Sequence, residues 1–148
     1  MRHSACSVFG ALLIALLLQP ALAQTPPQDI EWPPNDGCSA PAQSMTIAAG
    51  TLIDRFGSER GTFVSPRGES YASRALPYVC EQLNYHVYRV DRPLPAMSCK
   101  AAPWFGQPGG AVQMKLSAHV DQLEAGGALT PVLVALGPNH GIPQCKAP

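Results

Sequence analysis

Prolines and glycines recur along this chain at a density that long helices do not tolerate. Its 148 residues include 16 Pro and 13 Gly. Proline removes a backbone donor and clashes with the preceding helical turn, while glycine lowers helix stability. A helical bundle is therefore excluded, and the lack of a Gly-X-Y period excludes a collagen-like chain. The sequence predicts a compact, loop-rich domain of strands with little helix.

Charge along the chain is sparse and balanced. Ten Lys and Arg match ten Asp and Glu, and only 14% of residues are charged while 46% are hydrophobic. Broad capture of nucleic acid needs a concentrated basic surface, and a disordered acidic tail needs the opposite excess. We therefore expect no nucleic-acid partner, and the length fits one domain.

The N-terminus has the pattern of a secretory signal peptide. Arg2 precedes an apolar run over 8–18, and the small-residue site Ala21-Leu22-Ala23 follows it. An uncleaved membrane anchor is the alternative, but the run is shorter than the ~20 apolar residues that span a bilayer. We expect residues 1–23 to be removed after Ala23, giving a secreted protein without stable membrane association.

The cysteines then indicate disulfides. Removal of the leader leaves Cys38, Cys80, Cys99 and Cys145, an even number in an oxidising compartment. Their spacing matches no C-x-x-C zinc pattern, so no metal site is predicted. Four cysteines allow three pairings, among which the sequence does not choose. Our expectation is Cys80–Cys99 together with Cys38–Cys145, the second bridge joining the two ends of the domain.

Hydrophobic patterns and turn residues outline the elements. Residues 24–44 read as an extended arm pinned by Trp32 and Cys38, because prolines and an Asn-Asp-Gly turn interrupt them. Alternation over 112–116 places Gln113 opposite Val112, Met114 and Leu116. We expect further strands over 45–53, 61–65, 85–90 and 129–136, helical turns over 69–76, and a short helix over 116–123 that ends at 126–127.

Several short motifs combine arginine, aromatic rings and glycine. They are Asp54–Gly57, Gly61–Pro66, Arg74–Pro77 and the segment 102–110 that leads to Gln113. Two guanidinium groups can hold a diphosphate, two Phe rings can stack on a flat heterocycle, and glycines let backbone approach a ligand. The composition of these motifs is typical of a nucleotide pocket.

These strings resemble the tuberculosis necrotizing toxin domain family, whose members include bacterial toxins and fungal surface enzymes. The matching strings are W-P-P-N-D-G (32–37), D-R-F-G (54–57), G-T-F-V-S-P-x-G (61–68), R-A-L-P (74–77), Y-H-V-Y-R-V (85–90), P-L-P (93–95), A-P-W-F-G-Q-P-G-G (102–110) and L-E-A-G-G-A-L (123–129). They run in order through nearly the whole mature chain. The resemblance implies a small α+β domain over 45–148, with a twisted central antiparallel sheet, few short helices and long, disulfide-stabilised loops.

The resemblance also implies an activity, hydrolysis of NAD⁺ or NADP⁺ to nicotinamide and ADP-ribose. The dinucleotide would be the substrate, and no cofactor is expected. Such a protein would be a toxin or an NAD-depleting effector, and a bacterial host would be expected to hold a cognate immunity protein. Two alternatives stay open, namely ADP-ribosyl transfer or cyclisation on the same fold, and a secreted binding module without activity.

Family positions transfer to named residues. Arg55 and Arg74 match the arginines that hold the diphosphate, and Phe56 and Phe63 match rings that line the pocket beside nicotinamide. Gln113 matches a glutamine that is needed for catalysis and also contacts substrate.

His86 corresponds to a histidine implicated in bacterial members, so the catalytic positions implied are Gln113, Arg55 and His86. Each of these residues also has a structural interpretation, since a phenylalanine can be core, an arginine can pair with a neighbouring carboxylate, and a strand histidine can be buried. The family often reads G-G-G-T-Q-Y where this chain has Gly109-Gly110-Ala111-Val112-Gln113-Met114.

Overall fold

The structure is a computed structural model that describes residues 30–135, 137 and 141–145. The predicted signal peptide, its cleavage point after Ala23 and the arm up to residue 29 lie outside the described residues. None of the described helices is long and apolar enough to cross a membrane.

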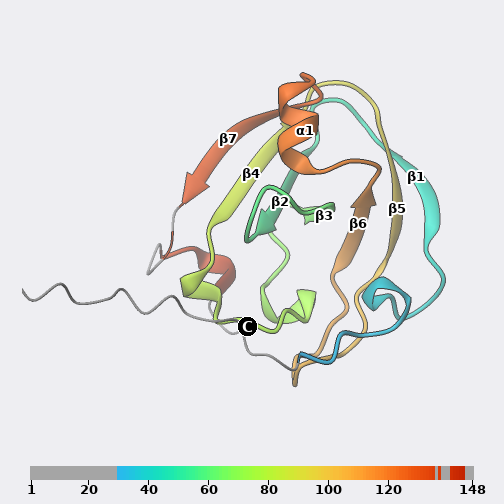
Figure 1. Cartoon of the computed structure of the whole chain (residues 1–148), viewed down its shortest axis with the longest axis vertical. Coiled ribbons are helices and arrows are strands. Elements are labelled where there is room, and N and C mark those ends of the chain that lie inside the picture. Colours follow the sequence, from blue (N-terminus) through green and yellow to red (C-terminus); the bar gives the residue numbers. More distant parts are fainter. Residues whose placement is uncertain (1–29, 136, 138–140, 146–148) are drawn as a thin grey trace, which may run out of the picture.

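Seven strands of the described chain form one antiparallel sheet, in the order β1-β5-β6-β3-β2-β4-β7 (Figure 1). The strands are β1 (Gln43–Ile47), β2 (Leu52–Phe56), β3 (Phe63–Pro66), β4 (Tyr85–Val90), β5 (Leu94–Lys100), β6 (Val112–Leu116) and β7 (Leu129–Ala135). One α-helix, α1 (Val120–Ala125), covers one end of the curved sheet, and the loops contain 3₁₀ turns η1 (Asn35–Gly37), η2 (Ala72–Arg74), η3 (Cys80–Gln82) and η4 (Pro143–Cys145). The expected strand-dominated α+β fold is confirmed.

The short strand β3 joins two halves of this sheet. Its first residues pair with β6 (Phe63 with Lys115, Val64 with Met114), and its last residues pair with β2. Since β3 has only four residues, it connects β2 and β6 over a short length only. A cavity lies where the two halves diverge.

Two hydrophobic clusters pack against the two halves of the sheet and stabilise them. The larger one includes Ile53, Tyr88 and Leu129, and Val120 of α1 packs into it. The smaller one includes Phe56, Tyr71 and Tyr85 and lies beside the cavity. Rings of this size remove much apolar surface from water, so the smaller cluster gives the cavity a rigid wall.

The strands expected over 85–90 and 112–116 are confirmed with the same bounds. The strand expected over 45–53 is instead two strands, β1 and β2, separated by a turn in which the Thr51 amide donates to the Ala48 carbonyl. As a result, residues 54–56, which follow the expected strand, lie in β2. Strand β5 was not predicted, because Pro95 argues against a strand there. Pro95 is accommodated since it pairs with β1 only, beyond the end of β6.

The expected disulfide pairing is wrong. The bridges are Cys38–Cys99 and Cys80–Cys145, with Cα atoms 5.6 and 5.5 Å apart. Cys38 lies beside the end of β5, where its backbone forms an isolated antiparallel β-bridge with Ala101. Cys145 comes from η4, which the Tyr71 amide holds by donating to the Gln144 carbonyl. The spacing of the cysteines along the chain does not indicate that Cys38 neighbours Cys99 or that Cys80 neighbours Cys145.

Candidate active site

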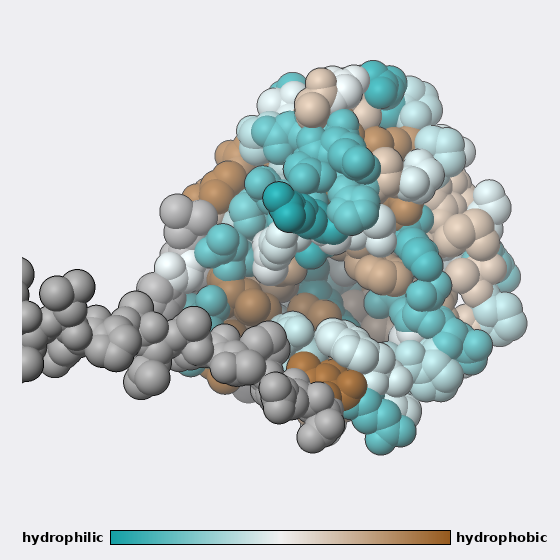
Figure 2. Space-filling model, viewed as in Figure 1, coloured by the Kyte–Doolittle hydropathy of each residue, from teal (hydrophilic) through white to brown (hydrophobic). Residues whose placement is uncertain are grey.

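A cavity of about 350 Å³ opens between the two halves of the sheet. Five predicted site residues line it, although they come from β2, β3, η2 and β6: Arg55, Phe56, Phe63, Arg74 and Gln113. Figure 2 shows hydrophilic side chains gathered over α1 and the neighbouring loop, with the face hollowed below them. The fold therefore gathers residues that the sequence separates by up to 58 positions (113 − 55).

Two further hollows adjoin this cavity. They have volumes of about 590 and 340 Å³, and both share Phe63 and Gln113 with the central cavity. The central cavity alone is at the small end of the range for ligand sites. Phe63 and Gln113 thus stand where three hollows meet, which gives an extended ligand room on either side of them.

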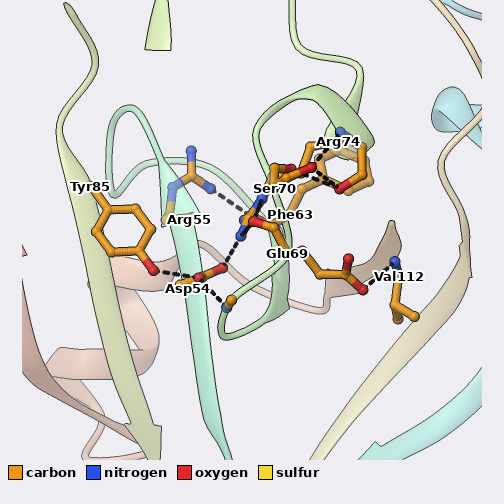
Figure 3. Close-up of polar contacts among 10 residues, drawn as sticks. Asp54, Arg55, Phe63, Glu69, Ser70, Arg74, Tyr85 and Val112 are labelled. Atoms are coloured by element: carbon orange, nitrogen blue, oxygen red, sulfur yellow. Dashed lines mark hydrogen bonds and ion pairs between the residues drawn. The ribbon is translucent and has the colours of Figure 1, made fainter. Parts of the chain in front are cut away.

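A buried ion pair supports the wall of the cavity (Figure 3). Asp54 is fully buried, and its Oδ1 accepts a hydrogen bond of 2.5 Å from Arg74 Nη2. Its Oδ2 accepts bonds from the Tyr85 hydroxyl at 2.5 Å and from the Gly68 amide at 3.1 Å. With both oxygens satisfied, the carboxylate fixes Arg74 in a low-dielectric setting. Burial and the adjacent carboxylate raise the pKa of Tyr85 well above its usual range, so its hydroxyl remains a donor.

Arg74 presents one part of its guanidinium to the cavity. Its Nε and Nη2 donate to the Glu69 carbonyl at 3.3 and 2.9 Å, and its Cζ lies 5.1 Å from the centroid of the Phe56 ring. Nη1 takes part in none of these hydrogen bonds. The Glu69 carboxylate in turn accepts a bond of 3.3 Å from the Val112 amide, so this loop is fastened to the strand that carries Gln113.

The guanidinium of Arg55 lies in a cradle of backbone. Its Nη1 donates to the Phe63 carbonyl at 2.9 Å. A Cβ atom at Gly61 would lie 2.2 Å from both Nη1 and Nη2, so only glycine leaves room for the group. Burial lowers the pKa of Arg55, partly offset by Tyr88 and Glu59, but arginine remains charged in proteins.

Gln113 reaches across the cavity to the turn at the start of the described chain. Its Nε2 donates to the Asp36 carbonyl at 2.7 Å. Beside it, Lys115 Nζ pairs with Asp36 Oδ2 at 2.8 Å and lies 5.5 Å from the Phe63 ring centroid. Trp32 from the same turn region lines the cavity and packs edge-on against Phe105, with centroids 5.8 Å apart.

His86 is not among the residues that line the cavity. It pairs with Arg55 across β2 and β4, on the same face of the sheet. Its side chain is buried, with Nδ1 3.3 Å from Glu59 Oε1 and the ring stacked on Tyr88 at 6.1 Å between centroids. The same Glu59 oxygen accepts a bond of 2.8 Å from the Tyr88 hydroxyl. Of the six predicted residues, this one alone does not line the cavity.

Comparison with known proteins assigns this arrangement to a family. Residues 46–132, more than half of the chain, match the sequence model of the family described as tuberculosis necrotizing toxin.

The chain belongs to the tuberculosis necrotizing toxin family. A relative, the conidial surface nicotinamide adenine dinucleotide glycohydrolase of Aspergillus fumigatus, is 34% identical over 119 residues, covering 71% of this chain and 51% of the relative. The chain therefore spans about half the length of that relative. The structure of tuberculosis necrotizing toxin complexed with its immunity factor IFT matches with a TM-score of 0.57 at 26% identity, covering 67% of this chain and 60% of the solved one.

The departure from the tuberculosis necrotizing toxin family pattern before Gln113 is accommodated by the backbone. Gly109 and Gly110 have φ of +69° and +95°, whereas Ala111 does not adopt a left-handed conformation. A Cβ at Gly109 would lie 2.7 Å from the Ala101 carbonyl oxygen, so glycine is required there. Ala111 is buried, and its amide donates to the Ser73 carbonyl at 2.9 Å. The alanine side chain at position 111 therefore causes no backbone strain at the site of this family member.

Sequence reasoning missed two residues that shape this toxin-family site, Asp36 and Tyr85. Asp54 is the neighbouring carboxylate that could have paired with Arg55, but the structure pairs it with Arg74. A signal for Tyr85 was present, since a tyrosine opens the strand that pairs with β2. Asp36 gave no signal, because it contacts Gln113 through its backbone carbonyl. Within the described residues, no group of three or more His, Cys, Asp or Glu is placed to hold a metal ion.

His86 makes the stability of the folded chain depend on pH. Burial lowers its pKa, opposed by Glu59 and Glu124 and reinforced by Arg55. The unfolded chain therefore binds more protons than the folded one as the pH falls below about 6.5, the ordinary histidine value. We expect the free energy of unfolding, measured with urea, to fall between pH 7.5 and 5.5, and His86→Gln to reduce this fall. The control His119→Gln, at an exposed position, should retain the wild-type fall, and an equal loss in both variants would contradict the assignment.

Proposed function

We propose that this chain hydrolyses NAD⁺ or NADP⁺ at the bond between nicotinamide and ribose, releasing nicotinamide and ADP-ribose. One observation carries the proposal: Arg55, Phe56, Phe63, Arg74 and Gln113, which match the family's positions, line a single cavity. The activity printed for the fungal relative supports the same reaction. NAD⁺ is thus the substrate, and the proposed chemistry uses no cofactor.

In this proposal the two arginines hold the diphosphate and leave the Phe63 ring to nicotinamide. Arg55 and Arg74 already have their orientation fixed by the Phe63 carbonyl and by Asp54, so little ordering is needed when substrate binds. Phe63 is partly exposed at the meeting point of the three hollows, where a pyridinium ring can stack. Phe56 is buried and supports Arg74 from below.

The reaction needs little acid assistance. The C1′–N bond breaks with its electron pair passing to the pyridinium nitrogen, so nicotinamide leaves neutral and a ribosyl oxocarbenium ion develops. Water then attacks C1′ and loses a proton to solvent. Gln113 accepts a hydrogen bond from that water or from a ribose hydroxyl, which orients the reactants. His86 acts indirectly in this proposal, through the packing around Arg55.

The Gly61→Ala variant tests the position of the Arg55 guanidinium without disrupting the fold. Its Cβ would displace the guanidinium, which is the end of a flexible side chain, so the chain should still fold. We expect KM for NAD⁺ to rise about tenfold, the scale of one lost charge-assisted hydrogen bond. Steady-state kinetics and thermal unfolding would measure both effects. An unchanged KM in a folded variant would remove Arg55 from the diphosphate site.

The decisive test of the function is product analysis. The purified, oxidised protein is incubated with NAD⁺, and nicotinamide and ADP-ribose are quantified by chromatography. Equal release of both supports hydrolysis. A cyclic product, or transfer of labelled ADP-ribose to a protein acceptor, would replace hydrolysis by cyclisation or transfer. No consumption of NAD⁺ by the folded protein would favour a binding module.

We also propose that the protein acts outside the cell that makes it. The expected signal peptide, the two disulfides and the conidial surface named for the fungal relative support this location. In a bacterial host, an immunity protein would protect the producing cell. The immunity factor that accompanies tuberculosis necrotizing toxin in its structure supports that partner class.

A further inference from the structure

The amide of Gln113 is held by a backbone carbonyl rather than by a side chain. Its Nε2 donates to the Asp36 carbonyl at 2.7 Å, across 77 positions of sequence. A carbonyl oxygen can only accept, so this bond fixes which end of the amide faces the Asp36 turn. The acceptor Oε1 is therefore the end left for the substrate. Cys99, the strand partner of Gln113, has its Sγ 3.9 Å from the same Nε2.

The turn that supplies this carbonyl has left-handed backbone at three successive residues. Asn35 and Asp36 have φ of +53° and +55°, and Gly37 has φ of +77°. Asn and Asp adopt left-handed backbone more readily than other residues with a Cβ, but three left-handed residues in succession are kept in one conformation by surrounding contacts. Free of those contacts, the turn would relax and move the Asp36 carbonyl.

The Cys38–Cys99 disulfide supplies the strongest of those contacts. It directly follows the turn and joins it to β5, next to the strand of Gln113. The Ala102 amide adds one bond of 2.7 Å to the Gly37 carbonyl. The ion pair of Asp36 with Lys115 contributes less, because both side chains are about half exposed.

We propose that the Cys38–Cys99 disulfide and the Asn35–Gly37 turn position Gln113 for the reaction. By holding the Asp36 carbonyl on Nε2, they keep Oε1 toward the substrate. The inference rests on the proposed hydrolysis of NAD⁺, and it adds a positioning role to a bridge that would otherwise only stabilise the fold.

The two disulfides provide a matched test. They join residues 61 and 65 positions apart, so removing either one relieves the unfolded chain of nearly the same constraint. We expect Cys38→Ser/Cys99→Ser to lower kcat about tenfold, the scale of one lost hydrogen bond, with little change in KM. The comparison variant Cys80→Ser/Cys145→Ser removes a bridge that packs in the smaller hydrophobic cluster, away from Gln113, so it should lose similar thermal stability and lower kcat clearly less than the first pair. Equal kcat in the two double variants would overturn the proposal.

A double-mutant cycle with Gln113→Ala distinguishes positioning from general support. If the bridge acts through Gln113, its removal has no further effect on kcat once Gln113 is alanine. If the kcat losses of the disulfide variant and of Gln113→Ala multiply in the combined variant, the proposal is overturned. Where the Cys38→Ser/Cys99→Ser chain does not fold, Gly37→Ala carries the same cycle, because it keeps both bridges and strains the turn at φ +77°. A wild-type protein that consumes no NAD⁺ would instead refute the proposed function.

Discussion

The Gln113→Ala variant is expected to fold normally and to hydrolyse NAD⁺ about a hundredfold more slowly, the scale of one lost oriented group in a transition state. Gln113 is partly exposed at the meeting point of three hollows, so its truncation removes no core packing. The loss should appear in kcat, since the diphosphate contacts are untouched. Initial rates of nicotinamide release over a range of NAD⁺ concentrations measure it.

The matched control for this prediction is Gln43→Ala. Gln43 is an exposed residue of the edge strand β1 and does not line the central cavity. The same substitution there should leave both kinetic constants near wild type. Wild-type turnover by a folded Gln113→Ala protein would exclude Gln113 from catalysis, and with it the role assigned to the Asp36 turn.

Among the substitutions described, Asp54→Ala should lower the free energy of unfolding the most. In Asp54→Ala, Arg74 stays buried without its carboxylate, and the Tyr85 hydroxyl and Gly68 amide lose an acceptor. Breaking a buried pair from one side typically costs about 3–5 kcal/mol, a large part of the stability of a small domain. We expect denaturant unfolding to show this loss, together with a lower affinity for NAD⁺ because Arg74 is released.

An exposed aspartate provides the comparison. Asp91 also pairs with an arginine, Arg89, at 2.9 Å and accepts a hydrogen bond from the Thr130 hydroxyl, but these groups lie on the surface of the sheet. Water screens such a pair, so Asp91→Ala should change the free energy of unfolding little. A similar small effect for Asp54→Ala would show that the network around Arg74 does not support the cavity wall.

Much of the site was predictable because the relevant residues lie in short, distinctive strings. Arg55, Phe56 and Phe63 come from strings that stay close together in the fold, since β2 and β3 are neighbours. Arg74 was predicted to contact substrate, and its deeper role as the partner of Asp54 depends on a contact between β2 and a loop 20 positions away. Pattern and residue type do not encode such a contact.

The histidine illustrates a different limit. His86 lies on a strand with the expected bounds, and the strand register puts it beside Arg55. Arg55 on the same face of the sheet lines the cavity, so whether the His86 ring also does depends on the side chains packed against it, Glu59 and Tyr88. The alternation of β4 does not decide this, because both faces of that strand are buried.

The sequence by itself determined the class of the protein, through cysteines that form disulfides, strands in place of helices, and the strings of the tuberculosis necrotizing toxin family. These are local properties of composition and spacing, which turn chemistry and hydrophobic periodicity express directly. The tertiary structure alone decided the disulfide partners, the burial of Asp54 against Arg74 and the hold of the Asp36 carbonyl on Gln113. Each of these joins segments far apart in the chain, and only the packing of the sheet and its loops sets the distance between them.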